Sequence, residues 1–362
     1  MQHHAAVARQ IHLSLLFSFP EPPLNHLNAW RDLRAQGVEI VALCDTDRAK
    51  AEQAARDFGV PEIYTDFSQM LGEARLGLVD IVTQVRSHRP LVELSLAAGV
   101  PTIVQKPFGL TLDDCAKMTA LSMQRAVPLA IHENFRFQLA MRKARDILTS
   151  GEIGDANWAR ISFRTGYDIY SGQPYLREER KFVLNDLGPH VLDLARFLLG
   201  EVNWLTAETQ MRRKDLAGED TASMLLRHVS GTVSVVECTY ESKRLPDTFP
   251  ETLLEIEGTQ GALILKSGYE LSVTSGGKSR SINADPTAAP WMERPWHVVQ
   301  DSVLTTCQHI LTALQQGRPS DVTASDNFKT MALCDAAYQS AESHRAVSPR
   351  NFESSQHQIQ GR

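Results

Sequence analysis

The sequence predicts an α/β domain with a doubly wound parallel sheet, followed by an α+β domain with an open, mainly antiparallel sheet. Up to about residue 135, short apolar runs alternate with helical patterns, which is the order of elements in a parallel sheet. Beyond that point, longer strands follow one another through glycine-containing turns. The 362 residues, of which 43% are hydrophobic, are sufficient for two cores of ordinary size.

The first domain is expected over residues 1–135, with an atypical start at residues 1–24. Its clearest strand is Val38–Asp45, a nearly continuous apolar run that suits a buried parallel strand and ends on an aspartate. The other strands expected from apolar runs are Ile11–Phe19, Val79–Thr83, Thr102–Val104 and Val127–Asn134. Helices are expected at Leu24–Gln36, through Ala55 to Gly59, within Ile63–Leu71, at His88–Ala98 and at Asp113–Arg125.

The second domain is expected over residues 136–345, and the polar residues 346–362 are expected to form a disordered tail. The domain begins with a helix at Leu139–Ser150, which Gly151 ends. Its expected strands are Asn157–Thr165, Trp204–Arg212, Ser223–His228, Thr232–Ser242, Thr252–Glu257, Ala262–Lys266 and Glu270–Thr274. Its remaining helices are expected at Phe182–Leu199, Val298–Gln316 and Ala324–Ser343.

Charge and cysteine usage point to a small-molecule partner in a reducing compartment. A net charge of −6 gives no basic field, so no nucleic-acid partner is expected. The five cysteines are scattered and never form a C-x-x-C pair, which favours a cytoplasmic protein without structural zinc. The apolar stretch within Met1–Phe19 is interrupted by polar residues and lacks a cleavage site, and no other run is long enough to span a bilayer. We therefore expect no membrane partner.

A lysine follows the strand Thr102–Val104, in the segment TIVQKPF. Ligands of open parallel sheets sit outside the carboxyl ends of the strands, and Pro107 stiffens the turn that presents Lys106 there. Asp45 ends another strand, where a carboxylate can accept both ribose hydroxyls of a dinucleotide and repel a 2′-phosphate. The alternatives are a surface lysine for Lys106 and a helix cap for Asp45.

The segment NDLGPHVLDLARFLLG places Asp186 and His190 four residues apart at a helix start. Histidine suits proton transfer to or from a hydroxyl at neutral pH, and a neighbouring carboxylate would orient it and stabilise its cation. The alternative is that Asp186 only caps the helix and His190 only packs.

The segment IHENFRFQ follows an apolar strand and offers four hydrogen-bonding groups for a polyhydroxyl ligand: His132, Glu133, Asn134 and Arg136. It is not a zinc motif, because the second histidine of H-E-x-x-H is absent, and we expect no metal site. The alternative is a solvated loop.

From about His26 to Val347 the chain resembles the Gfo/Idh/MocA oxidoreductase family. The resemblance depends on the order and spacing of Asp45, Thr83 with His88, Gln105-Lys106-Pro107, Asn134 with Arg136, and Asp186 with His190. It implies a Rossmann domain, a sugar-binding domain and hydride transfer between NAD(P) and a sugar, polyol or related alcohol. Carried over to this sequence, the catalytic group is Lys106, Asp186 and His190. The implied cofactor is NAD rather than NADP, held by Asp45, Thr83, His88, Lys106 and Pro107.

In the same interpretation, the segment GYDIYSGQPYLR before the catalytic helix contacts the sugar. It lacks clear periodicity over about a dozen residues, which favours a binding loop, although an ordered connection is the alternative. Together with Asn134 and Arg136, the substrate contacts named from this segment are Tyr167, Tyr175 and Arg177, with Tyr170 and Gln173 beside them. A broad sheet with one uncovered face predicts a homo-oligomer, either a dimer or a tetramer.

The chain departs from the family pattern where the first strand should run into G-x-G-x-x-G. It has FSFPEPPLNH at Phe17–His26 instead, and no glycine occurs before Gly37. Pro20, Pro22 and Pro23 have no amide hydrogen to donate to a pyrophosphate, and Glu21 adds a negative charge. A second departure is Gln105, where the family usually has glutamate.

Three explanations remain open for the missing glycine loop. In the first, a frameshift or misassigned start replaced the original start, since similarity resumes abruptly at Asn25-His26-Leu27. In the second, the protein has lost dinucleotide binding and serves as a sugar-binding or regulatory protein. In the third, an active enzyme binds NAD without several phosphate hydrogen bonds, each worth roughly 1.5 to 3 kcal/mol.

Overall fold

The computed structural model describes residues 11–17 and 26–352. The chain divides into two compact units. The first contains the described parts of Met1–His132 together with Val303–Phe328, and the second contains Glu133–Ser302 and the described part of Lys329–Arg362. The segment Pro20–Pro23, where the sequence departs from the glycine-rich loop of the family pattern, lies outside the described residues. So do residues 353–362 of the expected tail.

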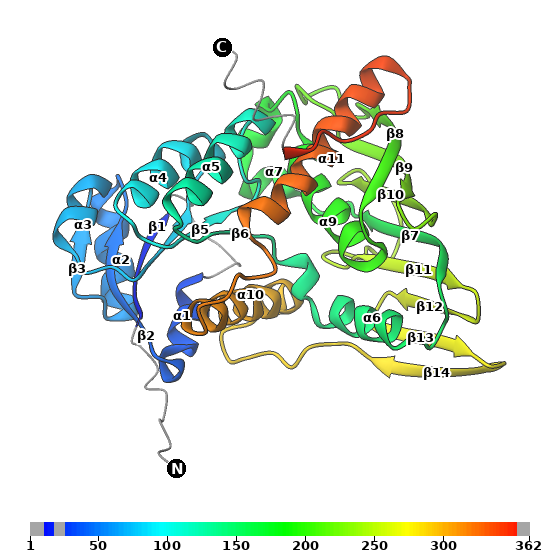
Figure 1. The fold of residues 1–362 in the computed structure, drawn as a ribbon, viewed down its shortest axis with the longest axis horizontal. Coiled ribbons are helices and arrows are strands. Elements are labelled where there is room, and N and C mark those ends of the chain that lie inside the picture. Colours follow the sequence, from blue (N-terminus) through cyan, green and yellow to red (C-terminus); the bar gives the residue numbers. More distant parts are fainter. Residues whose placement is uncertain (1–10, 18–25, 353–362) are drawn as a thin grey trace. The chain divides into compact units, whose positions relative to one another are not determined.

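The first unit is built on a six-stranded sheet in the order β3-β2-β1-β4-β5-β6, in which every pairing is parallel. Figure 1 shows these strands with α4 and α5 packed beside each other. This is the strand order of a doubly wound dinucleotide-binding sheet. The strands are β1 (Ile11–Phe17), β2 (Val38–Cys44), β3 (Glu62–Tyr64), β4 (Leu78–Val82), β5 (Thr102–Gln105) and β6 (Leu129–His132).

The helices of the first unit alternate with these strands, as the sequence predicts. They are α1 (His26–Asp32), a short 3₁₀ helix η1 (Arg34–Gln36), α2 (Arg48–Phe58), α3 (Phe67–Glu73), α4 (Val85–Ala97) and α5 (Leu112–Arg125). Gly37 and Gly59 end η1 and α2 in the left-handed conformation, which glycine adopts without strain. The chain returns to this unit through Val303–Phe328, where the Ile131 amide donates to the Val322 carbonyl at 2.8 Å.

The second unit is built on an eight-stranded sheet in the order β14-β13-β12-β11-β7-β10-β9-β8. Only the β7–β10 pairing is parallel among the described strands of this sheet, which matches the predicted mainly antiparallel sheet. The strands are β7 (Ala156–Arg164), β8 (Val202–Gln210), β9 (Thr221–His228), β10 (Val233–Thr239), β11 (Leu253–Gly258), β12 (Gly261–Lys266), β13 (Glu270–Ser275) and β14 (Lys278–Asn283).

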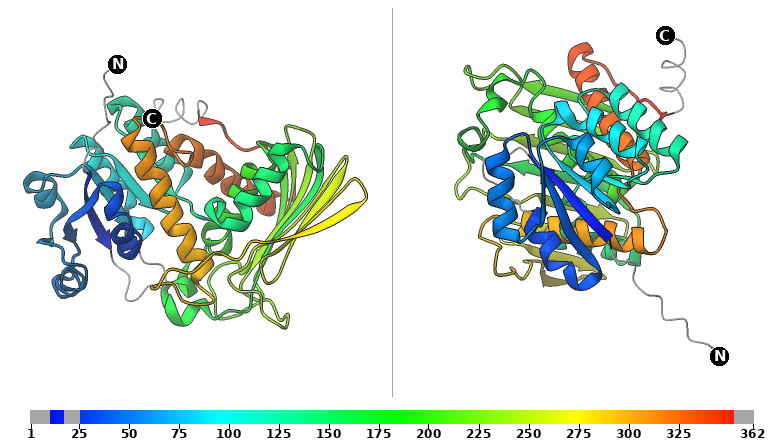
Figure 2. Two further views of the ribbon diagram at one scale, coloured as in Figure 1. Left: turned by 90° about the horizontal axis from the view of Figure 1, so that it is seen from below. Right: turned by 90° about the vertical axis from the view of Figure 1, so that its left-hand side faces the viewer.

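Helices of the second unit cover one face of this sheet (Figure 2). The helices and short 3₁₀ segments are η2 (Phe135–Phe137), α6 (Leu139–Ser150), α7 (Ile169–Gly172), η3 (Pro174–Glu178), α8 (Val183–Asp186) and α9 (Gly188–Leu199). The long helices α10 (His297–Gln315) and α11 (Ala324–Ser343) each contribute residues to both units. Within the described part of the chain, no helix has the length and apolarity needed to cross a membrane.

Several elements differ from the sequence prediction. The short strand β3 lies where only a connection and a helix were expected. The single helix expected at Phe182–Leu199 is wrong: α8 ends at Asp186 and α9 begins at Gly188, with Leu187 between them. The break has a local cause, because Pro189 lacks an amide hydrogen and belongs in the first turn of a helix. The strand β14 was not predicted, since its sequence KSRSIN shows no apolar alternation at the edge of the sheet.

Candidate functional site

The carboxyl ends of the parallel strands carry the residues expected to bind a nucleotide. Asp45 follows β2, Thr83 follows β4, and Lys106 follows β5. All these strands run in the same direction, so their ends lie at one edge of the sheet. The Lys106 amide donates to the Gln105 side-chain Oε1 at 2.7 Å, which fixes the backbone where β5 ends.

Asp45 has an unused acceptor. The Asp47 amide donates to its Oδ1 at 2.8 Å, whereas its Oδ2 is buried and has no hydrogen-bond partner among the described residues. Burial raises the pKa of the Asp45 carboxyl above its usual value. The cap of α2 is Asp47, whose side chain accepts from the amides of Ala49 and Lys50, so the alternative of Asp45 as the helix cap is wrong.

His88 connects two of the strand ends rather than facing a ligand. Its side chain is buried, with Nδ1 3.0 Å from the Pro107 carbonyl and Nε2 3.0 Å from the Thr83 carbonyl. Burial lowers the pKa of His88, which favours the neutral ring. A neutral ring carries one N–H and can donate to only one of the two carbonyls. His88 therefore hydrogen-bonds either Thr83 or Pro107, with its ring between the segments after β4 and β5.

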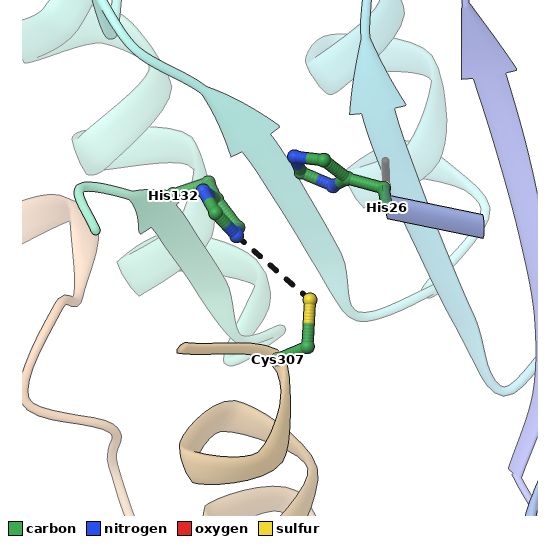
Figure 3. A group of neighbouring side chains, drawn as sticks. All are labelled: His26, His132 and Cys307. Carbon is green, nitrogen blue, oxygen red and sulfur yellow. Dashed lines mark hydrogen bonds between the residues drawn. The ribbon is translucent and has the colours of Figure 1, made fainter. Parts of the chain in front are cut away.

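A buried cluster in the same unit has the composition of a metal site. His26, His132 and Cys307 come from α1, β6 and α10, and their donor atoms lie within 4.8 Å of one another (Figure 3). However, both nitrogens of His26 are engaged: Nδ1 lies 2.8 Å from Asp80 Oδ2 and Nε2 lies 3.1 Å from Gln105 Nε2. Burial raises the pKa of the Cys307 thiol, and burial beside His26 lowers the pKa of His132 to about 3. These groups are therefore neutral hydrogen-bonding partners, with His132 Nε2 3.8 Å from Cys307 Sγ.

In the second unit, His190 is paired with a carboxylate from outside its own helix. Its Nδ1 lies 2.5 Å from Glu133 Oε1, and the Phe135 ring stacks on the imidazole at 3.7 Å between centroids. Both His190 and Glu133 are buried. A neutral ring that donates its Nδ1 hydrogen to Glu133 keeps an unprotonated Nε2, which is the form a general base requires.

Asp186 has a different partner. It is the last residue of α8, and its Oδ2 accepts a hydrogen bond from the Tyr240 hydroxyl at 2.8 Å. The residue before α9 is Leu187 and makes no side-chain cap, so the alternative of Asp186 as the cap of that helix is wrong. Tyr240 is buried, and burial together with the nearby Asp186 raises its pKa, so the hydroxyl keeps its proton and donates it.

The segment after β6 is buried rather than a solvated loop. Asn134 Nδ2 donates to Ser302 Oγ at 2.7 Å. Arg136 forms a two-bond ion pair with Asp193, including Nε to Oδ2 at 2.7 Å, and both side chains are buried. This pairing gives the Arg136 guanidinium a partner in the interior of the second unit, and its contact with a sugar stays a prediction.

The GYDIYSGQPYLR segment forms α7 and η3. Tyr167 is partly exposed, stacks on Phe249 at 4.0 Å between ring centroids, and lines a pocket that also includes Arg244 and Asp247. The Tyr175 hydroxyl donates to Gln173 Oε1 at 2.7 Å. Arg177 is ion-paired with Asp215 and lies over the buried Tyr170 ring at 5.0 Å.

Sequence reasoning named Glu133 only as a group able to hydrogen-bond a polyhydroxyl ligand, and it assigned Tyr240 no role. It did not predict the pairing of Glu133 with His190. Glu133 stands in the IHEN segment, and its place after an apolar strand was a usable signal. Tyr240 lies 54 residues from Asp186 at the end of β10, and no local pattern marks it.

Comparisons with known proteins define the class. The family model described as "Oxidoreductase family, NAD-binding Rossmann fold" matches residues 24–132, and the GFO/IDH/MocA C-terminal domain matches residues 141–264. The chain is 44% identical to D-apiose dehydrogenase from Paraburkholderia graminis over 329 residues, 91% of this chain and 87% of the relative. It is 42% identical to D-apiose dehydrogenase from Rhizobium rhizogenes over 90% of this chain and 93% of the relative.

A solved structure agrees with these relatives. The crystal structure of an oxidoreductase from Agrobacterium radiobacter in complex with NAD+, L-tartaric acid and magnesium is 40% identical, with a TM-score of 0.90. The similarity covers 94% of this chain and 98% of that chain. Fold and matches therefore define an oxidoreductase with an NAD-binding Rossmann domain. The chain belongs to the Gfo/Idh/MocA family, and the predicted fold class and sugar-dehydrogenase class are confirmed.

Proposed function

We propose that this protein is an NAD-dependent dehydrogenase that oxidises a hydroxyl group of D-apiose or a closely similar sugar. The observation that carries the proposal is the 44% identity to a D-apiose dehydrogenase over 91% of the chain. The second such relative, at 42% identity, supports the same substrate class. Within the second unit, the buried pairing of His190 with Glu133 is consistent with this chemistry.

In the proposed reaction, His190 Nε2 takes the proton of the reacting hydroxyl as the C–H hydride leaves. Glu133 then stabilises the imidazolium through the 2.5 Å contact at Nδ1. The Lys106 ammonium hydrogen-bonds the reacting oxygen and stabilises its developing negative charge. NAD+, when bound, supplies the hydride acceptor. Asp186, whose Oδ2 accepts from the Tyr240 hydroxyl, adds a second carboxylate. In the proposal it accepts a hydrogen bond from a sugar hydroxyl or stabilises the His190 imidazolium.

The residues present fit the ribose of NAD. The buried Asp45 Oδ2 has no partner among the described residues, and a ribose hydroxyl would satisfy it. The carboxylate at the end of β2 would repel a 2′-phosphate, which favours NAD over NADP. The family model match begins at residue 24, so the proline-containing segment before it is not part of that match.

The experiment separates cofactor binding from turnover. Calorimetry with NAD on the purified chain measures binding, and NADH absorbance in the presence of D-apiose, other aldoses and polyols measures turnover. We expect NAD binding and D-apiose-dependent NADH formation that disappears in Lys106→Ala and His190→Ala. Sugar binding without NAD binding would instead support the cofactor-impaired, regulatory alternative, and turnover of another substrate class alone would contradict the assignment of the sugar.

The homo-oligomer remains a proposal supported by the uncovered sheet face. Outward-facing positions of that face include the exposed Leu225 and Ile264 and the partly exposed Trp158. The same face also carries ion pairs of Glu237 with Arg160 and Arg164. Exposed apolar side chains on such a face favour self-association. Native mass spectrometry should give a dimer or tetramer that Ile264→Glu dissociates, and a monomeric wild-type chain would contradict the proposal.

A further inference from the structure

We propose that His26 and Gln105 are positioning residues for Lys106, acting through a hydrogen-bonded chain that starts at Asp80. The proposal rests on the proposed function, in which Lys106 contacts the reacting oxygen. The four residues come from α1, β4 and the end of β5, and all belong to the first unit. The chain runs from the Asp80 carboxylate through His26 and Gln105 to the Lys106 amide.

The Lys106 amide fixes the orientation of the Gln105 side chain. A backbone N–H requires an acceptor, so the atom 2.7 Å from it must be the amide oxygen Oε1. The Gln105 NH₂ group therefore faces His26 Nε2 at 3.1 Å. This settles an assignment that otherwise depends on the choice between two amide orientations.

The orientation of Gln105 in turn fixes the proton of His26. The Gln105 NH₂ group is a donor, so His26 Nε2 accepts and carries no hydrogen. The hydrogen of the neutral ring is then on Nδ1, where it is donated to Asp80 Oδ2 at 2.8 Å. Trp30 Nε1 donates to the same Asp80 oxygen at 2.8 Å. Each group in the chain donates in one direction, from the Gln105 amide toward the Asp80 carboxylate.

The surroundings hold the His26 ring in place. His26 is 4% exposed and Asp80 is fully buried. The His132 ring lies 4.2 Å from the His26 ring, and His132 is itself held by Cys307 (Figure 3). Burial lowers the pKa of His132 to about 3 and raises the pKa of Cys307, so neither group changes charge near neutral pH. Burial raises the pKa of Asp80, but the hydrogen bonds from His26 and Trp30 favour the ionised carboxylate, and the pKa is lowered overall.

The arrangement makes the amide of Gln105 essential in a way that can be tested. A glutamate at this position keeps an oxygen for the Lys106 amide, but its second oxygen cannot donate to His26 Nε2. The contact then requires a hydrogen on Nε2, which makes His26 an imidazolium between two carboxylates. In Gln105→Glu the hydrogen-bonded chain is therefore complete only when both ring nitrogens of His26 carry hydrogen, a form that low pH favours by mass action.

The experiment compares wild type, Gln105→Glu and Gln36→Glu, which makes the same charge change at an exposed position of the same unit. We expect the ratio of the Gln105→Glu kcat to the wild-type kcat to fall about tenfold from low to high pH, as one charge-assisted hydrogen bond is lost. The Gln36→Glu ratio should stay constant. Gln105→Met, which removes both hydrogen bonds, should lower kcat at every pH.

A readout without catalysis keeps the inference separate from the proposed function. Nitrogen-15 NMR of the imidazoles should show His26 in the wild type as the neutral ring with hydrogen on Nδ1, and in Gln105→Glu as the imidazolium at low pH. A hydrogen on Nε2 in the wild type, or a kcat ratio that does not change with pH, would overturn the proposal. If the wild type turns over no sugar, the NMR result still decides the hydrogen-bonded chain, and only the proposed function fails.

Discussion

Replacing Glu133 by glutamine tests whether a carboxylate outside the D-x-x-x-H motif supports the catalytic histidine. Glu133 Oε1 lies 2.5 Å from His190 Nδ1 in the interior of the second unit. Glutamine can still accept the Nδ1 hydrogen with its own oxygen, so the tautomer and position of the ring are preserved. The substitution therefore removes the negative charge and leaves the geometry in place.

The expected magnitude follows from the burial of the pair. A hydrogen bond to a charged group contributes about 1.5 to 3 kcal/mol, and here the charge matters most when His190 becomes an imidazolium in the transition state. Each 1.4 kcal/mol corresponds to about tenfold in rate, so we expect kcat to fall by about 10- to 100-fold. The KM for the sugar should change little, because the ground-state contacts are unaltered.

Steady-state rates of NADH formation, measured across pH, provide the assay. Glu152→Gln is the matched control, because Glu152 is paired with Arg280 on the surface of the same unit, and its kcat should equal that of the wild type. Far-ultraviolet circular dichroism and thermal unfolding verify that each variant is folded. A Glu133→Gln enzyme with wild-type kcat at every pH would refute the assignment of Glu133 as the partner of the general base.

Three further substitutions test other parts of the structure. Asp45→Ala should weaken NAD binding by about tenfold and reduce the preference for NAD over NADP, as measured by calorimetry. Burial raises the pKa of Asp45, and it is the ionised carboxylate that accepts the ribose hydroxyls. The NAD affinity of the wild type should therefore fall as the pH is lowered through that pKa. An affinity that does not change with pH would contradict this. Arg136→Lys should lower the free energy of unfolding in urea by about 2 kcal/mol, because lysine cannot make both bonds to the buried Asp193. As the control, Arg280→Lys on the surface should leave the urea midpoint unchanged. Tyr240→Phe should lower kcat without changing NAD affinity, because it frees Asp186 from its hydroxyl donor; unchanged kcat would show that Asp186 needs no such support.

The fold was largely predictable because apolar periodicity is a local property. The alternation of short strands and helices up to residue 135 predicts the parallel sheet, and the structure has it in the order β3-β2-β1-β4-β5-β6. The return of Val303–Phe328 to the first unit was not predictable in this way. Its helical spacing predicts only that α10 and α11 are helices, because both units offer apolar surfaces against which such a helix can pack.

The candidate site residues could be singled out from the sequence, but their pairing could not. Strand ends and helix starts mark Lys106, Asp186 and His190, and their catalytic roles follow from the family resemblance and stay predictions. Arg136 illustrates the limit: a guanidinium after a strand suits a polyhydroxyl ligand, and no local pattern predicts its pairing with Asp193, 57 residues away. Whether a polar group faces a ligand or another polar group depends on tertiary contacts, which a single sequence does not contain.

Each proposed catalytic group is supported by a residue that its own motif does not supply. His190 pairs with Glu133, 57 residues away, Asp186 pairs with Tyr240, 54 residues away, and the Lys106 backbone depends on His26 through Gln105. The motif therefore determines which groups are present, whereas residues after β6 and β10, in α1 and at the end of β5 support them. Two proteins with the same D-x-x-x-H and K-P motifs can consequently differ in the pH dependence of kcat if these supporting positions differ. Gln105 is one such position, because this sequence has glutamine where the family usually has glutamate.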